Sequence, residues 1–395
     1  MKLIRIAVPV GLVVASVACS GGVEEPSLGT TSVDLSRTCT WTVVPSPNVG
    51  MSDNSLSSVD GDSPGNIWAV GSLVPDSNPD ITNTLIQHYN GTRWTVFPSP
   101  NVGTQANSLN SVAAIPGRPV AVGFYIDDQT FSPQSLIERF DGHQWQVIDH
   151  PHAGISDELS AISAISSSDV WAVGFQRDSS GQFHTLTEHY SGGAWSVVPS
   201  PDPGSFGNQL FGVAAVSAND VWAVGGQVGS KAPDGALILH WNGTAWSDVT
   251  APTDGALSTN LFAVASFSSS SNAQAVGDAH NNRSGSRALV ESGNSQWRIV
   301  SAPSVGTGDN HLYGIALDTA NVGWAVGSFL DPAGNMETLV LAGGNSGWSR
   351  VPSPSPSTTG DSVLGGVTLV GGTDVWAVGA FDGANAQQTL VEHCH

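Results

Sequence analysis

The four residues Trp-Ala-Val-Gly, or close variants of them, recur along the whole chain at an almost constant interval. Their final glycines are Gly71, Gly123, Gly174, Gly225, Gly277, Gly327 and Gly379. The interval is roughly fifty residues, and a repeat of that length with several short β-type runs is typical of arrays of small sheets. This repeat constrains the architecture strongly, but it names no reaction.

One period, 159–201, shows what each repeat holds. Four runs of small, β-branched and aromatic residues, at 159–165, 170–174, 185–190 and 194–201, are separated by turn residues. They predict a four-stranded antiparallel meander, whose strands we letter A to D from the centre outward. Seven such meanders predict an all-β fold, a seven-bladed β-propeller with four antiparallel strands per blade. The repeated glycine should end strand B, where a missing Cβ permits positive φ or close backbone approach.

Tryptophan follows the same period. Strand D carries Trp41, Trp94, Trp145, Trp195, Trp246, Trp297 and Trp348, and strand B carries Trp68, Trp171, Trp222, Trp324 and Trp376. Val120 and Gln274 replace the strand-B tryptophan in two repeats, and Trp241 stands where other repeats have tyrosine. We interpret every tryptophan as packing between blades, because an aromatic platform for a sugar would need one outside this pattern.

The repeats are out of phase with the two ends of the sequence. The last run, 389–394, is a strand C with no strand D after it, and the first run, 38–45, is a strand D with nothing before it. We therefore expect the N-terminal strand to complete the last blade and close the ring. Cys39 and Cys394 should then face each other within disulfide range. The alternative is a metal site formed by Cys394 and the histidines beside it.

The first residues have the features of an export signal. Lys2 and Arg5 precede an apolar stretch that is too short to span a membrane, and together they define a signal peptide over 1–18. Ser16-Val17-Ala18-Cys19 resembles a bacterial lipobox, although Ser16 stands where such boxes carry an aliphatic residue. We expect lipid on Cys19, and the alternative is ordinary cleavage after Ala18. A flexible tether over 19–37 and a propeller domain over 38–395 follow.

The charge balance excludes some classes of partner. The chain has 33 acidic residues against 12 lysines and arginines, for a net charge of −21. Such a surface repels nucleic acid and anionic lipid, so we expect no nucleic-acid partner and membrane contact only through the lipid anchor. Together with the leader and the predicted disulfide, this indicates an exported bacterial monomer, either a cell-envelope lipoprotein or a secreted protein.

Candidate ligand-binding residues lie where the B–C and D–A loops would share one face. These loops vary most and carry many of the acids, among which Asp127, Asp128, Asp157 and Glu158 are the candidates for a ligand or catalytic site. A polar residue precedes the strand-A leucine in each repeat. Four of these residues, which should ring the upper mouth of the channel and could hold water, a cation or a ligand, are Asn54, Asn107, Asn208 and Asn310. Alternatively, they cap the strand ends.

Other motifs are weak. The stretch that begins Asp60-Gly61-Asp62 looks like a short calcium loop but lacks the distal glutamate, so we interpret it as the A–B turn. We expect no cofactor, with calcium as the one candidate. The recurrent strand-C histidines lie in separate blades and cannot share a metal, and His150-Pro151-His152 is isolated. The sequence has no G-x-S-x-G, no H-E-x-x-H and no phosphate loop.

The pattern D-V-W-A-V-G followed by L-x-x-H-[YW]-N-G-T-x-W resembles the repeats of bacterial secreted W-A-V-G propellers. Over 39–395 it is more loosely similar to the Asp-box, or BNR, repeats of sialidase-like propellers. A sialidase would imply three arginines converging on a substrate carboxylate, and strand A contains no arginine in any repeat. We therefore expect a non-enzymatic scaffold whose acidic loop face binds a protein or glycan at the cell surface. The alternatives are a lectin-like carbohydrate-binding propeller and a glycan hydrolase or lyase.

Overall fold

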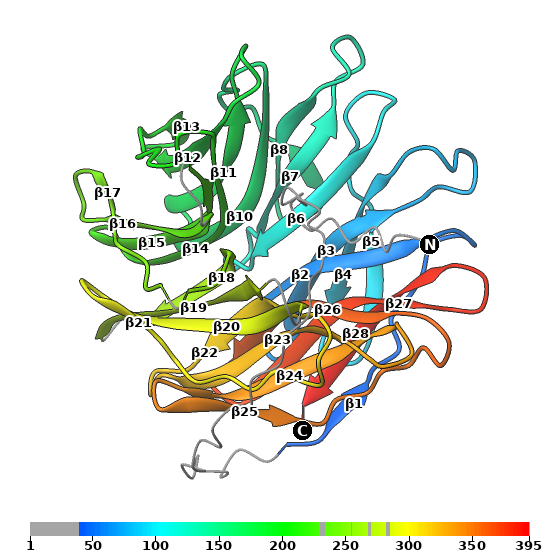
Figure 1. Ribbon diagram of the computed structural model, residues 1–395. Helices are drawn as coiled ribbons and strands as arrows, with labels where there is room; N and C mark the ends of the chain where they lie inside the picture. The colour runs from blue at the N-terminus through cyan, green and yellow to red at the C-terminus, as the bar shows by residue number, and fades with distance from the viewer. Residues whose placement is uncertain (1–38, 230–233, 254, 268–269, 282–284, 395) are drawn as a thin grey trace.

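The computed structural model describes residues 39–394 except 230–233, 254, 268–269 and 282–284. Within that part of the chain the regular structure is entirely β: there are 28 strands and no helix, so none that could cross a membrane (Figure 1). The predicted signal peptide over 1–18, the tether over 19–37 and Cys19 lie outside the described residues.

The strands fall into four-stranded units, which we number in chain order. The first is β2 (Asn54–Ser63), β3 (Asn66–Leu73), β4 (Asn83–Tyr89) and β5 (Trp94–Phe97). The second is β6 (Asn107–Ala113), β7 (Val120–Ile126), β8 (Pro133–Phe140) and β9 (Trp145–Val147). The third is β10 (Ser156–Ser166), β11 (Asp169–Arg177), β12 (Phe183–Ser191) and β13 (Ala194–Val197). The fourth is β14 (Gly207–Ser217), β15 (Asp220–Val228), β16 (Gly235–Trp241) and β17 (Trp246–Asp248).

The remaining units repeat this order. The fifth is β18 (Ser258–Phe267), β19 (Ser270–Asn281), β20 (Gly285–Gly293) and β21 (Trp297–Ile299). The sixth is β22 (Asn310–Leu317), β23 (Val322–Leu330), β24 (Met336–Gly344) and β25 (Gly347–Val351). The seventh is β26 (Ser362–Val370), β27 (Asp374–Asp382), β28 (Gln387–Cys394) and, from the other end of the chain, β1 (Trp41–Val43). The four strands A to D of the sequence pattern are thus present in each unit.

The sheets are antiparallel, and their first strands lie innermost. The third and fourth units merge into one eight-stranded sheet through a single parallel pair, Phe183 with Gly207. Each innermost strand contacts the innermost strand of the next unit, and β26 contacts β2. Figure 1 shows the units arranged around a common centre, with the blue β1 beside the red β28.

The repeated glycine lies inside strand B rather than at its end, which corrects the prediction. Leu159 pairs with Gly174, and the register then shifts by one residue, so strand A bulges there. The bulge brings the carbonyl of Glu158 against Gly174, where a Cβ would collide with it. The backbone of Gly174 does not have positive φ. Because the same collision recurs at the other six glycines, close approach alone explains the residue.

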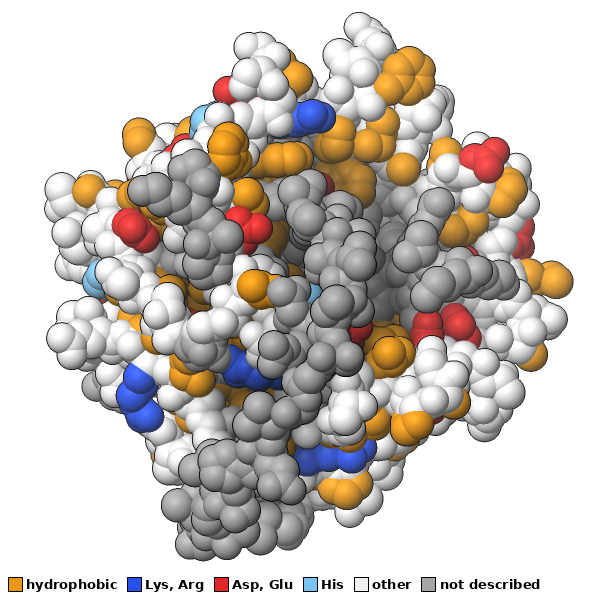
Figure 2. Space-filling view, viewed as in Figure 1, with side chains coloured by type: hydrophobic (Ala, Val, Ile, Leu, Met, Phe, Trp, Pro, Cys, Tyr) orange, Lys and Arg blue, Asp and Glu red, His pale blue; other side chains and the backbone are white. Residues whose placement is uncertain are grey.

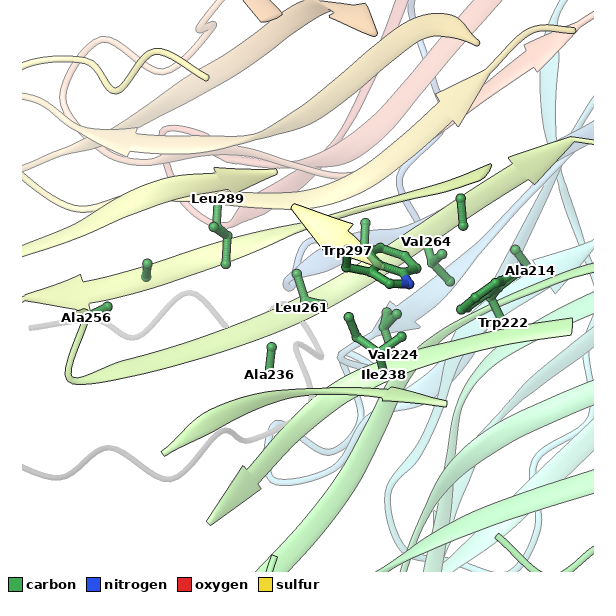
Figure 3. Close-up of a cluster of buried hydrophobic side chains, with 13 residues drawn as sticks. Ala214, Trp222, Val224, Ala236, Ile238, Ala256, Leu261, Val264, Leu289 and Trp297 are labelled. Carbon is green, nitrogen blue, oxygen red and sulfur yellow. The ribbon is translucent and has the colours of Figure 1, made fainter. Parts of the chain in front are cut away.

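Indole rings pack the seams between neighbouring units. The strand-B tryptophan of one unit meets the strand-D tryptophan of the next nearly edge-on, as in Trp222 and Trp297, whose ring centroids are 5.3 Å apart. Figure 3 shows these two rings with Val224, Ile238 and Val264 in the core between the fourth and fifth units. The same contact joins Trp68 to Trp145, Trp171 to Trp246, Trp324 to Trp41 and Trp376 to Trp94.

A histidine of strand C stacks on the strand-B indole. The rings of His189 and Trp171 lie 4.1 Å apart, and His189 Nε2 is 2.7 Å from a carboxylate oxygen of Asp169, two residues before the tryptophan. His240 with Asp220 and His393 with Asp374 repeat the arrangement. Each recurrent histidine therefore packs against the tryptophan of its own unit.

The cysteines form the predicted disulfide, with a different register from the one expected. Cys39 and Cys394 are bonded, and their Cα atoms are 5.4 Å apart. The strand partner of Cys394 is Trp41, however, so Cys39 lies two residues beyond the directly opposed position. The bond joins the two ends of the described chain.

The calcium-like stretch contains the predicted A–B turn at Pro64 and Gly65, but its first residues belong to strand A. Asp60 lies within β2, and its carboxylate accepts hydrogen bonds from the N–H of Ala114 at 2.8 Å and from Thr368 Oγ1 at 3.1 Å. These partners belong to the second and seventh units, so Asp60 joins three units. Among the described residues, no group of three or more His, Cys, Asp and Glu side chains could hold a metal ion.

Candidate functional site

The four predicted asparagines close their own D–A loops. Asn54 is buried, and its Oδ1 accepts from Val49 N–H at 2.9 Å while Nδ2 donates to the carbonyls of Val49 and Ser52 at 3.1 and 2.8 Å. Corresponding bonds to the preceding loop are made by Asn107, Asn208 and Asn310. This geometry agrees with the alternative interpretation, in which they cap strand ends.

Many loop-face acids tie neighbouring units together. The D–A loop aspartate accepts a hydrogen bond from the first residues of the preceding strand C, as Asp202 does from Thr185 N–H at 2.7 Å. Equivalent bonds are made by Asp53, Asp157, Asp309 and Asp361. Figure 2 shows acidic side chains scattered among uncharged ones on the face in view. Several acids that suggested a charged binding face are therefore occupied by backbone donors.

Asp128 is one of these ties. Its Oδ1 accepts from the N–H and the hydroxyl of Thr104, at 2.9 and 3.0 Å, which fastens the β7–β8 loop to the loop before β6. Asp76 makes the same connection to Met51 and Ser52 in the first unit. Because the role repeats, Asp128 has a structural explanation.

Asp157 shares its bond to strand C with the other D–A aspartates, but it also holds His152, a histidine of its own D–A loop, and forms a cluster with it. Its Oδ1 accepts from the N–H of Ser135 at 2.7 Å and from the Ser135 hydroxyl at 3.0 Å, and His152 Nδ1 lies 3.4 Å away. Burial alone would raise the pKa of Asp157, but hydrogen bonds from His152, Ala153 and Ser135 outweigh it, and the pKa lies below its ordinary value. The carboxylate is thus held ionised although it is fully buried.

His152 gives this cluster a surface. Its side chain is 41% exposed, and the hydrogen bond to Asp157 raises the pKa of the imidazole. Nδ1 faces both Asp157 and Ser135, so a serine-histidine-aspartate relay is absent, because a relay needs the serine on the other ring nitrogen. Nε2 makes no hydrogen bond to another described residue. The pair can therefore present an oriented imidazole to a ligand.

Tyr125 flanks the exposed imidazole, and Asp127 lies near Tyr125. The ring of Tyr125 lies 6.3 Å from that of His152, nearly perpendicular to it, and burial together with Asp127 and Asp157 raises the pKa of the phenol. Asp127 accepts from Thr130 N–H at 2.8 Å, which lowers its pKa and fixes the tip of the loop. The structure thus brings Asp127 and Asp157 near one tyrosine, as residues on the predicted face.

Glu158 points away from that cluster. Successive residues of a strand face opposite sides, and Glu158 Oε1 accepts from Asn110 Nδ2 of β6 at 3.1 Å. Burial raises the pKa of Glu158 to about 7. Asn110 in turn lines the central cavity.

The central cavity has a volume of about 510 Å³ and is bounded by the seven innermost strands. Ser57, Asn110 and Ser160 line one part of its wall. Phe211, Phe262 and Tyr313 line another, with neighbouring ring centroids 5.8 and 5.6 Å apart. None of the four predicted asparagines belongs to the lining residues.

Sequence reasoning missed Tyr125, Ser135 and His152 as members of one cluster. The available signal was His150-Pro151-His152, which has no counterpart in the other repeats. His150 is itself buried between Glu188, at 3.2 Å from Nδ1, and the carbonyl of Ser135, at 3.2 Å from Nε2. A break in the repeat therefore marked the site better than the number of acids did.

Neither the protein-family models nor the curated proteins compared with this sequence give a match. Solved structures that share its fold include a protein of unknown function from Dyadobacter fermentans DSM 18053, 8% identical, TM-score 0.51, covering 87% of this chain and 97% of that one. The GH74 xyloglucanase of Xanthomonas campestris is 14% identical, TM-score 0.51, covering 89% of this chain, which spans 55% of that enzyme. A PL25 ulvan lyase bound to -[GlcA(1-4)Rha3S]- is 8% identical, TM-score 0.50, covering 86% and 96%.

At these identities the likeness shows the fold alone. The chain is a propeller-like, all-β repeat protein, in agreement with the loose similarity expected from its repeats. The assignment to W-A-V-G-repeat propellers remains a prediction.

Proposed function

We propose that the seven units are the blades of one closed β-propeller, displayed outside the cell as a binding scaffold. Closure is supported by the contact between β26 and β2, by the hydrogen bond from Thr368 to Asp60 and by the pairing of β1 with β28. Export and a lipid on Cys19 rest on the leader sequence. Intact-mass analysis of protein from the membrane fraction tests them: a mature chain that begins at Cys19 without added lipid mass contradicts the anchor.

The binding surface of this proposal is the loop face around His152 and Asp157. The observation that carries it is the break in the repeat: other D–A loops use their polar residues to close the scaffold, whereas this loop also exposes an oriented imidazole. Tyr125 supplies an aromatic ring and a hydroxyl beside it, and Asp127 supplies a carboxylate near Tyr125. Such a surface suits a surface glycan or a polar protein segment, because it offers several directional hydrogen bonds on a rigid scaffold.

Binding of the purified protein to arrays of cell-surface glycans and surface proteins tests this assignment. Each hit is compared between the wild type, His152→Asn and Asp127→Asn. Asp331→Asn is the matched control, because Asp331 fixes the tip of a loop in the sixth unit by accepting from Asn335 N–H, much as Asp127 does. We expect the first two variants to bind on the order of tenfold more weakly and the control to bind as the wild type does. Equal losses of affinity in all three variants would show that binding depends on the overall charge of the loop face, and would overturn the assignment.

A glycan hydrolase or lyase is the second candidate, and the paired His152 and Asp157 favour it. An exposed imidazole whose other nitrogen is held by a buried carboxylate is equipped to move a proton. The fold shared with a xyloglucanase and an ulvan lyase is compatible with such activity but does not establish it. The test is whether the wild type forms new reducing ends or unsaturated uronates from surface polysaccharides. If it does, and His152→Asn does not, the enzyme proposal replaces the scaffold proposal.

A further inference from the structure

The seam between the second and third units lacks one of its two indoles. Val120 of β7 stands where other units carry the strand-B tryptophan, so Trp195 of β13 has no tryptophan to meet. The other strand-D tryptophans are at most 8% exposed, whereas Trp195 is only half-buried. Trp195 packs against the apolar side chains of this seam on one side but has no indole partner, and its partly exposed ring can serve as an aromatic platform.

A cleft opens at this seam. It has a volume of about 460 Å³ and is lined by Arg139, Asp149, His150, Tyr190 and Trp195 among others. A second, inner pocket of about 20 Å³, enough for roughly one water molecule, shares Arg139, Tyr190 and Trp195 with the cleft and is bordered by Val120. The outer cleft falls within the usual size of ligand sites, about 300 to 1,000 Å³.

The cleft carries an arginine that has no carboxylate partner, in a chain that is strongly acidic. Arg139 occupies the strand-C position that histidine holds in the third unit, and Arg118 occupies the place of that histidine's partner, Asp169. Both arginines line the inner pocket, and Arg139 alone also lines the outer cleft. Arg139 makes one long contact, Nη1 to Tyr190 Oη at 3.5 Å, and neither arginine forms an ion pair with a described carboxylate. Two arginines thus replace an acid and a histidine, and neither is paired with a described carboxylate, although Asp149 borders the outer cleft.

The aromatic side of the cleft is equally distinct. The rings of Trp195 and Tyr190 lie 5.5 Å apart at an angle of 50°, and both border the cleft. Sugar rings present a face of C–H groups to such platforms, and guanidinium groups bind carboxylates through paired N–H donors. Asp149, exposed at the rim, can accept hydrogen bonds from hydroxyl groups.

We propose that this cleft binds a sugar unit that carries a carboxylate, such as a uronic acid in an extracellular polysaccharide. The sugar ring packs against Trp195, the carboxylate meets Arg139, and Asp149 accepts from ring hydroxyls. The inference does not rest on the function proposed for the loop face, because the cleft uses different side chains at the seam.

Titration calorimetry of the full chain with uronate oligosaccharides tests the proposal, with neutral oligosaccharides of equal length for comparison. The uronates are trimers of glucuronate, galacturonate and mannuronate. We expect at least one uronate to bind more tightly than its neutral counterpart, and added salt to weaken it. Arg139→Gln should weaken binding by about tenfold or more, and Arg139→Lys by less, because lysine keeps the charge but loses the paired donors.

Two further variants separate the cleft from general charge. Val120→Trp restores the indole of the other seams and should abolish binding, because the new ring overfills the inner pocket and displaces Trp195 from its place beside the cleft. Arg93→Gln, the same charge change on the C–D turn of the first unit, should leave binding unchanged. The proposal is overturned if no uronate binds at millimolar concentration, if neutral trimers bind as well, or if folded Arg139→Gln binds as the wild type does.

Discussion

Val120 and Gln274 occupy the same position of strand B in the second and fifth units, yet the seams they face differ. At the fifth, Gln274 Nε2 donates to the backbone carbonyl of Asn321 at 3.3 Å, and Trp348 across the seam is 5% exposed. At the second, the valine leaves a cleft and a half-buried Trp195. The loss of one indole is therefore compensated at one seam and left open at the other.

Asn321 is what allows the fifth seam to close. It adopts φ of 66°, a left-handed conformation that asparagine tolerates better than most residues, and so turns its carbonyl toward Gln274. Asn345 adds two more contacts, accepting from Ser292 Oγ at 2.6 Å and from Arg298 Nη2 at 2.9 Å. The loop of the neighbouring unit, and not the substituted position itself, decides whether a missing tryptophan leaves a cleft.

Removal of the strand-D tryptophan that remains at each of these two seams should have the largest effect on stability. Trp348→Ala empties a packed seam, so we expect a loss of about 3 to 5 kcal/mol in the free energy of unfolding. Trp195→Ala should cost roughly half as much, because Trp195 is already partly in water. Chemical denaturation of both variants measures the difference, and equal losses would contradict an open second seam.

Buried glutamates of strand C allow the two seams to be compared by pH. Glu138 and Glu291 take equivalent positions in the second and fifth units, and both are buried without hydrogen-bond partners among the described residues. Burial raises the pKa of Glu291 from 4.5 to about 8, against the opposing charge of Arg287, and raises that of Glu138. Gln87 stands at the same position in the first unit, so an amide is accommodated there.

Glu291→Gln should therefore stabilise the protein at alkaline pH. An acid whose folded pKa is raised contributes stability below its unfolded pKa and loses it as pH rises through the folded value. The wild type should thus weaken between about pH 4.5 and 8, and the variant should gain on the order of 2 to 4 kcal/mol at pH 8 and nothing near pH 4. Glu138→Gln should act in the same direction. Denaturation midpoints that do not depend on pH in the wild type would contradict a buried, protonated glutamate.

Tryptophan placed at the two substituted positions should have effects of different size. Val120→Trp faces an inner pocket of only about 20 Å³, so its indole must push Trp195 outward into the open cleft, and we expect a change within about 1 kcal/mol in the free energy of unfolding. Gln274→Trp would collide with Asn321 in a filled seam and should cost about 1 to 3 kcal/mol. Thermal denaturation of the two variants measures both changes in stability. Destabilisation of the same size by both would mean that the second seam has already collapsed around Val120.

Periodic features of the fold could be predicted from the sequence because each repeat had to solve the same packing problem. The seams of paired indoles, the strand order and the partner of β28 followed from the period. The position of Gly174 inside strand B could not be predicted. The bulge in strand A that brings a carbonyl against Gly174 is not marked by any particular residue type in the sequence. The Asn90-Gly91 pair between strands C and D predicts a type I′ turn, which needs positive φ at both residues, but only Gly91 has it; Asn90 Oδ1 instead accepts from the N–H groups of Thr92 and Arg93.

The candidate site was less predictable, for a related reason. The number of acids on the loop face favoured Asp128 and Asp157 equally. In the structure, Asp128 connects two loops in a way that recurs in another unit, whereas Asp157 holds His152. Which backbone N–H an acid faces depends on how two loops from different units meet, and residue type does not encode that. Departures from the repeat, at His152 and at Val120, were visible in the sequence, but their partners were not.

The smallest expected difference concerns one arginine at each seam. Arg298→Gln removes a hydrogen bond to the carbonyl of Asn345 and should cost about 0.5 to 1 kcal/mol. Arg139→Gln removes only the long contact to Tyr190, so we expect a change within about 0.5 kcal/mol, the range of ordinary surface substitutions. Denaturation of both variants without ligand measures this. An arginine that adds nothing to stability yet lies beside two aromatic rings is available to a ligand, whereas a loss above about 1 kcal/mol would make Arg139 part of the scaffold.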